Sequence, residues 1–217
     1  MKKVIIAILV FSSIFAVSLV SFDRDYSRSS KFNLRKLNDH SIVIGEDYFT
    51  NQQVFSETSA ALLREAVTAL TKKKAWGFEP HIKIAINSGG GYVSFFERLA
   101  VADGALLEAY IVCTVSTAAS MAFTFMIKYC DERIMLPDAY ILQHQVYYQN
   151  LFGGRRYDDN TRRIALRHSD LEAKVLDIDR DKWFDISREN GDKVFTKDEL
   201  IKYKIATGFI KEPPKKD

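Results

Sequence analysis

Three patterns in this chain carry groups suited to acyl transfer. Ser120 stands in a run of small residues that follows the apolar stretch 110–115 and opens into a helical pattern. At a helix N-terminus, unpaired N–H groups and partial positive charge favour a developing anion. The glycines 89–91 end another apolar stretch and let backbone N–H groups approach a ligand closely. His144 ends a third such stretch. A nucleophile, an oxyanion-binding turn and a base are the parts that acyl transfer needs.

Two simpler interpretations of these patterns remain open. Ser120 or Thr117 could only cap the helix, as most hydroxyl residues before an apolar run do. The triple glycine could hold a phosphate, but neither a Gly-x-Gly-x-x-Gly pattern nor a Walker-type pattern is present.

Strands and helices alternate in the first half of the chain. The expected strands are 41–45, 81–87 and 110–115, and the expected helices are 56–74, 93–108 and one that starts near residue 120. This order predicts parallel strands joined by crossover helices, which is the α/β class.

The second half continues with short strands and a charged segment. The expected strands are 132–136 and 140–145, separated by Pro137 and Asp138. The segment 155–188 is too polar for a buried helix, so we expect it to project or to pack against another subunit. A strand passing into a helix follows, with Thr196 and Glu199 in capping-box register.

Composition describes one globular domain. The chain has 217 residues, 47% of them hydrophobic and 27% charged, which excludes a disordered chain and a multi-span membrane protein. The net charge is +3, and only +1 without residues 1–18, so no nucleic-acid partner is predicted.

The N-terminus indicates export. Residues 1–18 have the basic start, apolar run and small-x-small site of a signal peptide, with an uncleaved anchor to about residue 20 as the alternative. Either puts the domain outside the cytoplasm, exported to the periplasm or secreted, or tethered to a membrane. Residues 19–40 are expected to form a flexible leader and 212–217 a solvated tail.

Two cysteines, Cys113 and Cys130, lack metal-ligand spacing, and no metal site or cofactor is predicted. They are either two core thiols or a disulfide that export would permit, and the sequence leaves this open.

The chain from about residue 42 to 210 resembles the proteolytic subunit of the Clp protease, a serine peptidase of the ClpP/crotonase fold. Four segments carry the resemblance in family order: Ile86–Gly91, Ala118–Ala122, Ile141–Gln145 and Asp192–Glu199. The resemblance implies a protease domain over 41–211, built as a spiral of repeated β-β-α and βα units, with a projecting helical handle at about 150–190.

The resemblance also assigns roles to single residues. Ser120 matches the nucleophile, His144 the general base and Asp192 the orienting carboxylate. The oxyanion hole corresponds to the backbone N–H groups of Gly91 and Met121. The substrate-binding turn corresponds to Gly89, Gly90 and Tyr92.

The implied function is a serine endopeptidase that hydrolyses peptides or unfolded proteins through an acyl-enzyme. The resemblance further implies a ring-forming homo-oligomer. Family members work with an ATP-driven unfoldase inside the cell, and the export signal argues against that partner. Gly89, Val146 and Gly191 replace residues common in the family, and the last replacement weakens the expectation of a double ring.

Other assignments remain as alternatives. A non-catalytic scaffold could keep the fold, and a membrane-associated signal-peptide-peptidase-like protease would use a Ser-Lys dyad. Lys128 is eight residues along the helix from Ser120, a rise of roughly 12 Å, so a dyad would need a lysine from another subunit. His81 is a second choice as base, and His168 is expected at the surface. The carboxylates that compete with Asp192 are Asp177, Asp179, Asp181 and Asp185.

Overall fold

The computed structural model describes residues 42–44, 81–99, 106–107, 109–149, 154–189 and 191–211. Its framework is a sheet with the strand order β1-β2-β3-β4-β7, in which β8 also pairs with β4. The strands are β1 (Ile42–Ile44), β2 (His81–Ser88), β3 (Tyr110–Ala119), β4 (Glu132–Gln143), β7 (Lys193–Val194) and β8 (Gly208–Phe209). Strands β1 to β4 run parallel to one another, β8 is parallel to β4, and β7 is antiparallel to β4. The prediction of an α/β protein with a mostly parallel sheet is confirmed.

One strand replaces the two short strands predicted around Pro137. β4 runs continuously from Glu132 to Gln143, but its register against β3 shifts: Val115 pairs with Met135, and Thr117 pairs with Tyr140. The extra β4 residues therefore bulge out of the ladder at the proline, which has no N–H to donate to it. The bulge lets the strand resume in register with the end of β3.

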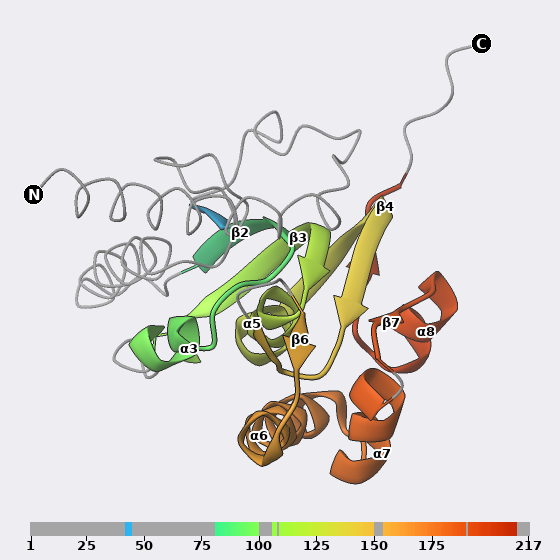
Figure 1. Ribbon diagram of the computed structural model, residues 1–217. Coiled ribbons are helices and arrows are strands. Elements are labelled where there is room, and N and C mark those ends of the chain that lie inside the picture. The colour runs from blue at the N-terminus through green and yellow to red at the C-terminus, as the bar shows by residue number, and fades with distance from the viewer. Residues whose placement is uncertain are drawn as a thin grey trace, which may run out of the picture.

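Helices cover one side of this sheet. The described helices are α3 (Ser94–Leu99), α5 (Met121–Tyr129), α6 (Asp159–Leu176), α7 (Arg180–Phe184), a π-helical turn (Asp185–Glu189) and α8 (Lys197–Lys202). Eight of the nine residues of α5 are buried, which makes it the central helix of the core. Figure 1 shows α5 and α6 on the same side of the sheet, with α7 and α8 beside them.

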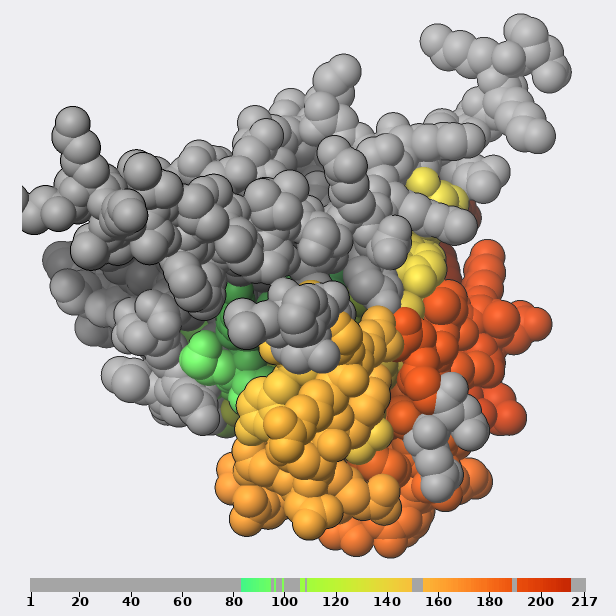
Figure 2. Space-filling model, viewed as in Figure 1, coloured from blue at the N-terminus to red at the C-terminus, as the bar shows by residue number. Residues whose placement is uncertain are grey.

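The charged segment 155–188 is several elements rather than one long helix. It begins with β6 (Arg155–Arg156), which forms a hairpin with β5 (Tyr148–Gln149). A capping box of Asp158 and Thr161 then starts α6. One face of α6 is buried, and its surface joins that of the C-terminal elements in Figure 2. The capping box predicted for Thr196 and Glu199 is confirmed at the start of α8.

Three stacked aromatic rings tie the C-terminal elements to α5. The ring centroids of Phe123 and Phe195 are 5.6 Å apart, and Trp183 stacks on both, at 6.2 and 5.8 Å. Such rings bury large apolar areas and favour defined geometry. The strand β7, and Asp192 before it, are thereby fixed relative to the helix that follows Ser120.

A disulfide joins Cys113 in β3 to Cys130, the residue after α5, with their Cα atoms 5.8 Å apart. The question that the sequence left open is therefore settled in favour of pairing. The bond closes the strand-helix unit that contains Ser120.

Several predicted segments lie outside the described residues. These are the signal peptide or anchor, the leader, the helix 56–74 and the tail 212–217. Over the part of the chain that the structure does describe, none of the helices has the length and apolar character to cross a membrane.

Candidate active site

The parallel register brings the glycine turn, Ser120 and His144 to one edge of the sheet. Ser88, the last residue of β2, pairs with Ala118, and Ala119 at the end of β3 pairs with Leu142. The residues just beyond these pairs are the glycines, Ser120 and His144. The carboxyl edge of parallel strands is where such sheets place their ligands.

Ser120 occupies a strained turn between β3 and α5. Its backbone has φ 54° and ψ −119°, a conformation that residues other than glycine rarely adopt. The Ser120 N–H donates to the carbonyl of Leu142 at 3.1 Å, and its own carbonyl accepts from the Thr124 N–H at 3.2 Å. In α/β-hydrolases, a serine on a sharp strand-to-helix turn is the nucleophile.

The alternative that Ser120 only caps the helix is wrong for this structure. Its side chain makes no capping hydrogen bond to α5. Ser120 is partly exposed, and its hydroxyl is not engaged by the first turn of the helix.

Gly90 packs directly against this turn. A β-carbon on Gly90 would lie 2.7 Å from the Ser120 β-carbon, 2.8 Å from the Ala119 carbonyl oxygen and 3.3 Å from the Met121 nitrogen. The φ of Gly90 is +107°, so its backbone also favours glycine. The Gly90 N–H donates to Ser88 Oγ at 3.2 Å.

The predicted oxyanion donors lie on the two sides of this contact. Met121 begins α5, where the first N–H groups have no partner within the helix. Gly91 follows Gly90 and is exposed. Of the predicted substrate-binding residues, Gly90 is buried against Ser120, Gly89 is partly exposed and Tyr92 is 54% exposed.

His144 is buried, and its ring is oriented by its own neighbour. Nδ1 lies 2.7 Å from the carbonyl oxygen of Gln145. Because a carbonyl only accepts, this contact requires the proton on Nδ1 and leaves the lone pair on Nε2. That is the neutral tautomer that a general base needs.

The surroundings of His144 also keep the ring neutral. Burial lowers the pKa of His144, and this effect outweighs the Gln145 carbonyl and the Asp192 charge, which raise it. Arg155 and Arg188 lower the pKa further. The centroid of the Tyr147 ring lies 5.2 Å from that of the imidazole, and the two rings are tilted by 35°.

Asp192 lies close to His144 but binds another residue. It precedes Lys193, whose pairing partner Gln143 precedes His144. Its carboxylate, however, accepts two hydrogen bonds from Arg155, at 2.5 and 3.1 Å. The structure thus brings the backbones of Ser120, His144 and Asp192 to one edge of the sheet. Within its described residues, however, the His144 ring is hydrogen-bonded to Gln145 and neither to Ser120 nor to Asp192.

The competing residues have other roles. Asp177 is the C-cap of α6, and Asp179 caps α7 through the Lys182 N–H. Lys128 Nζ donates to the Tyr129 hydroxyl. Both residues lie at the end of α5 opposite Ser120, so Lys128 is as far from Ser120 as expected and does not form a dyad with it. Asp181 pairs with Arg180.

The prediction that His168 lies at the surface is wrong. Its exposed fraction is 7%, and its ring centroid lies 5.8 Å from that of Phe96. Its position on the buried face of α6, in step with Ala165 and Glu172, explains this. The charged residues next to His168 in the sequence suggested a surface position, whereas the helical period places its side chain on the buried face.

Sequence reasoning also missed a buried polar cluster beside the site. The carboxylate of Glu172 is fully enclosed and binds Arg188, Gln143 and Thr124. An acidic residue on the apolar stripe of α6 was the available signal, because such a residue needs a buried partner.

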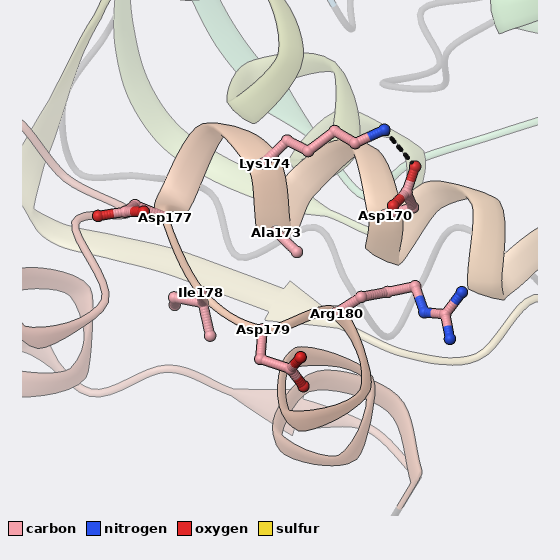
Figure 3. Close-up of a pocket in the computed structure, with 7 residues that line it drawn as sticks. All are labelled: Asp170, Ala173, Lys174, Asp177, Ile178, Asp179 and Arg180. Carbon is pink, nitrogen blue, oxygen red and sulfur yellow. Dashed lines mark hydrogen bonds and ion pairs between the residues drawn. The ribbon is translucent and has the colours of Figure 1, made fainter.

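Two surface cavities of about 310 Å³ lie in the described part of the molecule. One, in Figure 3, lies where α6 passes into α7, and the Lys174–Asp170 ion pair crosses its rim. The other borders the candidate site, since Asp192 and Arg188 line it with Asp185 and Lys193. Among the residues that the structure describes, no group of three or more His, Cys, Asp or Glu side chains could hold a metal ion.

Models of known protein families give no match to this chain, and neither do curated proteins.

Proposed function

We propose that this chain is a ClpP-like serine endopeptidase that hydrolyses peptides or unfolded proteins through an acyl-enzyme. One observation carries the proposal. Ser120 holds an uncapped hydroxyl on a strained turn, one strand away from a buried neutral histidine whose Nε2 is free to accept a proton. Backbone strain of this kind costs about 1–3 kcal/mol and persists mainly at functional sites.

In the proposed reaction, Ser120 Oγ attacks the carbonyl carbon of the substrate amide. His144 Nε2 takes the hydroxyl proton and then returns it to the leaving amine. Water, activated by the same imidazole, hydrolyses the acyl-enzyme and regenerates the serine. The lowered pKa of His144 keeps the ring in its basic form at neutral pH.

The oxyanion of the tetrahedral intermediate is assigned to the Met121 and Gly91 N–H groups. Met121 lies at the positive end of α5, and the close approach of Gly90 brings the glycine turn against it. A single donor of this kind contributes roughly a hundredfold or more in rate in other serine hydrolases.

Asp192 is proposed as the carboxylate that stabilises the protonated imidazole. In the present arrangement it is bound by Arg155, and the Gln145 carbonyl fixes the His144 tautomer instead. Catalytic hydrogen bonds are often incomplete without substrate. We therefore assign Asp192 an electrostatic role that strengthens when it leaves Arg155.

The same proposal includes the ClpP/crotonase spiral, with the β5–β6 hairpin and α6 as its handle, in a ring of identical subunits. Exposed aromatic side chains at this hairpin, Tyr148 and Tyr157, support a subunit contact there. The disulfide supports an oxidising compartment outside the cytoplasm.

The test is hydrolysis of a mixed fluorogenic peptide library by the wild-type protein, compared with Ser120→Ala and His144→Ala. We expect both substitutions to remove turnover. A serine-directed fluorophosphonate probe should label wild type and not Ser120→Ala. Peptide hydrolysis that survives in Ser120→Ala would overturn the proposal.

The Arg155–Asp192 ion pair favours one alternative, a non-catalytic scaffold that keeps the fold. In that case correctly assembled wild-type protein would neither hydrolyse peptides nor take the probe. Labelling distinguishes the two, because it requires an activated nucleophile.

A further inference from the structure

Glu172, on α6, lies where four other elements of the protein meet. Its Oε1 accepts from Thr124 Oγ1 at 2.6 Å, Gln143 Nε2 at 2.9 Å and Arg188 Nη2 at 2.8 Å. Its Oε2 accepts from Trp183 Nε1 and Arg188 Nη1, each at 2.8 Å. One carboxylate on α6 thus joins α5, β4, α7 and the π-helical turn.

The donors around Glu172 require it to be ionised. Each of the five contacts is a donor pointing at the carboxylate, which leaves no place for a proton on it. Burial raises the pKa of Glu172, but the Arg188 charge and the hydrogen bonds outweigh burial and lower it. The side chains of Glu172 and Arg188 are 0% and 1% exposed.

Gln143 connects this carboxylate to the proposed base. Because Glu172 only accepts, the amide nitrogen of Gln143 must face it, and the amide oxygen must face the other way. That oxygen accepts the backbone N–H of His144 at 3.0 Å. The side chain of Gln143 is therefore held at one end by Glu172 and holds His144 at the other.

Thr124 connects the same carboxylate to the proposed nucleophile. Its N–H donates to the Ser120 carbonyl at 3.2 Å, one turn along α5. Its hydroxyl donates to Glu172 and accepts from Gln143 Nε2 at 3.2 Å. The two backbones that carry Ser120 and His144 are thus fastened to one buried charge.

We propose that Glu172 is a positioning residue for the hydrolysis proposed above, setting His144 through Gln143 and Ser120 through Thr124. The inference rests on that proposed function. Buried ion pairs are often replaceable by apolar residues at no loss of stability, so stability alone does not call for this cluster. Positioning does call for it, because a misplacement of about 1 Å can lower turnover by roughly a hundredfold.

The main test is Gln143→Met, which keeps the length of the side chain and removes its amide. We expect kcat to fall at least tenfold while KM stays within twofold, because the base is displaced and the substrate turn is not. Ser169→Ala is the matched control: it removes a buried partner of Arg188 Nη1, at 2.9 Å, and this nitrogen binds Glu172 Oε2, whereas Gln143 binds Oε1. It should lower the melting temperature and leave kcat within twofold.

A second pair of variants, at Thr124, tests the proposal even if Gln143→Met does not fold. Thr124→Val removes the hydroxyl at nearly constant shape and should lower kcat, and Thr124→Ser should restore it. An unchanged kcat in both Gln143→Met and Thr124→Val would overturn the proposal. So would an equal loss of kcat in Ser169→Ala, since the cluster would then act only through stability.

Nitrogen-15 spectra of the histidine rings separate this inference from the proposed function. The signal missing in His144→Ala identifies His144, which should show a protonated Nδ1 in wild type and a changed tautomer ratio or pKa in Gln143→Met. If that change occurs in a protein without Ser120-dependent hydrolysis, the proposed function fails and the positioning of His144 stands. Identical His144 spectra in the two proteins would overturn the positioning itself.

Discussion

Gly90 lies so close to Ser120 that a β-carbon on the glycine would come within 2.7 Å of the β-carbon of the serine. The next nearest atom is the Ala119 carbonyl oxygen, which is backbone and cannot swing aside. The glycine turn and the turn at Ser120 therefore pack directly against each other, and both residues at this contact have a positive φ.

Gly90→Ala should disrupt this contact. The added methyl group meets both atoms below 3.0 Å and the φ of +107° adds backbone strain, so we expect a loss of about 2–5 kcal/mol in the free energy of unfolding. Fluorophosphonate labelling of Ser120 should fall by more than tenfold. Urea denaturation and the labelling rate measure the two effects.

Gly191→Ala is the control for strain alone. Gly191 has a φ of +90°, but a β-carbon there would meet nothing within 4 Å. Its cost should stay near 1–2 kcal/mol. Equal losses of stability in the two variants would show that packing against Ser120 adds nothing.

Arg155 and Asp192 should move the pH dependence of hydrolysis in opposite directions. The Arg155 charge lowers the pKa of His144, so Arg155→Gln should raise that pKa and move the acidic limb of kcat/KM to higher pH. The Asp192 charge raises it, so Asp192→Asn should move the limb to lower pH. The rate in Asp192→Asn should also fall, by roughly tenfold or more.

Arg156→Gln serves as the control in this series, since Arg156 is the exposed neighbour of Arg155 on the same strand. It should leave the acidic limb in place. A shift of the same size and direction in Arg156→Gln and Arg155→Gln would point to net charge rather than to the Arg155 contact.

The parallel sheet was predictable because its evidence is local. Apolar runs that end in small residues or glycine specify strands, and the helical patterns between them require crossovers. The convergence of Ser120 and His144 follows from this order once Ala119 pairs with Leu142. The capping box at Thr196 is likewise complete within four residues.

What escaped prediction depends on partners far apart in the sequence. Arg155 binds Asp192 from 37 residues away, and Glu172 binds Gln143 from 29 residues away. No spacing rule connects such pairs, because each joins two elements that only the folded chain brings together: β6 with the residue before β7, and α6 with β4. The Cys113–Cys130 bond was open for the same reason, since its Cα distance depends on how α5 folds back along β3.

The disulfide should account for a measurable share of stability. It closes a loop across 17 residues, for which the loss of unfolded-chain entropy corresponds to about 3 kcal/mol. Replacing Cys113 and Cys130 together by alanine should lower the free energy of unfolding by about that amount. Dithiothreitol should then lower the melting temperature of wild type only.

Alkylation gives an independent check of the bond. Protein denatured without a reductant should take up no iodoacetamide, and reduced protein should take up two equivalents. Uptake before reduction would contradict a bond between Cys113 and Cys130 and remove its support for an oxidising compartment.

His168 should make the protein less stable in mild acid. Burial lowers its pKa to about 4, helped by the charges of Arg188, Arg167 and Lys128 and opposed by Glu172. Its Nδ1 is buried and has no hydrogen-bond partner among the residues that the structure describes, so the charged ring finds no acceptor there. In the unfolded chain the pKa is near 6.5, so the unfolded state binds more protons than the native state between pH 6.5 and pH 4.

The contribution of neutral His168 to the free energy of unfolding is therefore fully present above about pH 6.5. It falls by about 3 kcal/mol in total as the pH drops toward 4. His168→Gln removes this titration and leaves His144 and the carboxylates in place. The difference in unfolding free energy between wild type and His168→Gln should accordingly change by that amount between pH 7 and pH 4 in urea denaturation. A difference that is constant over this range would mean that the folded protein accepts a proton on His168 as readily as the unfolded chain does.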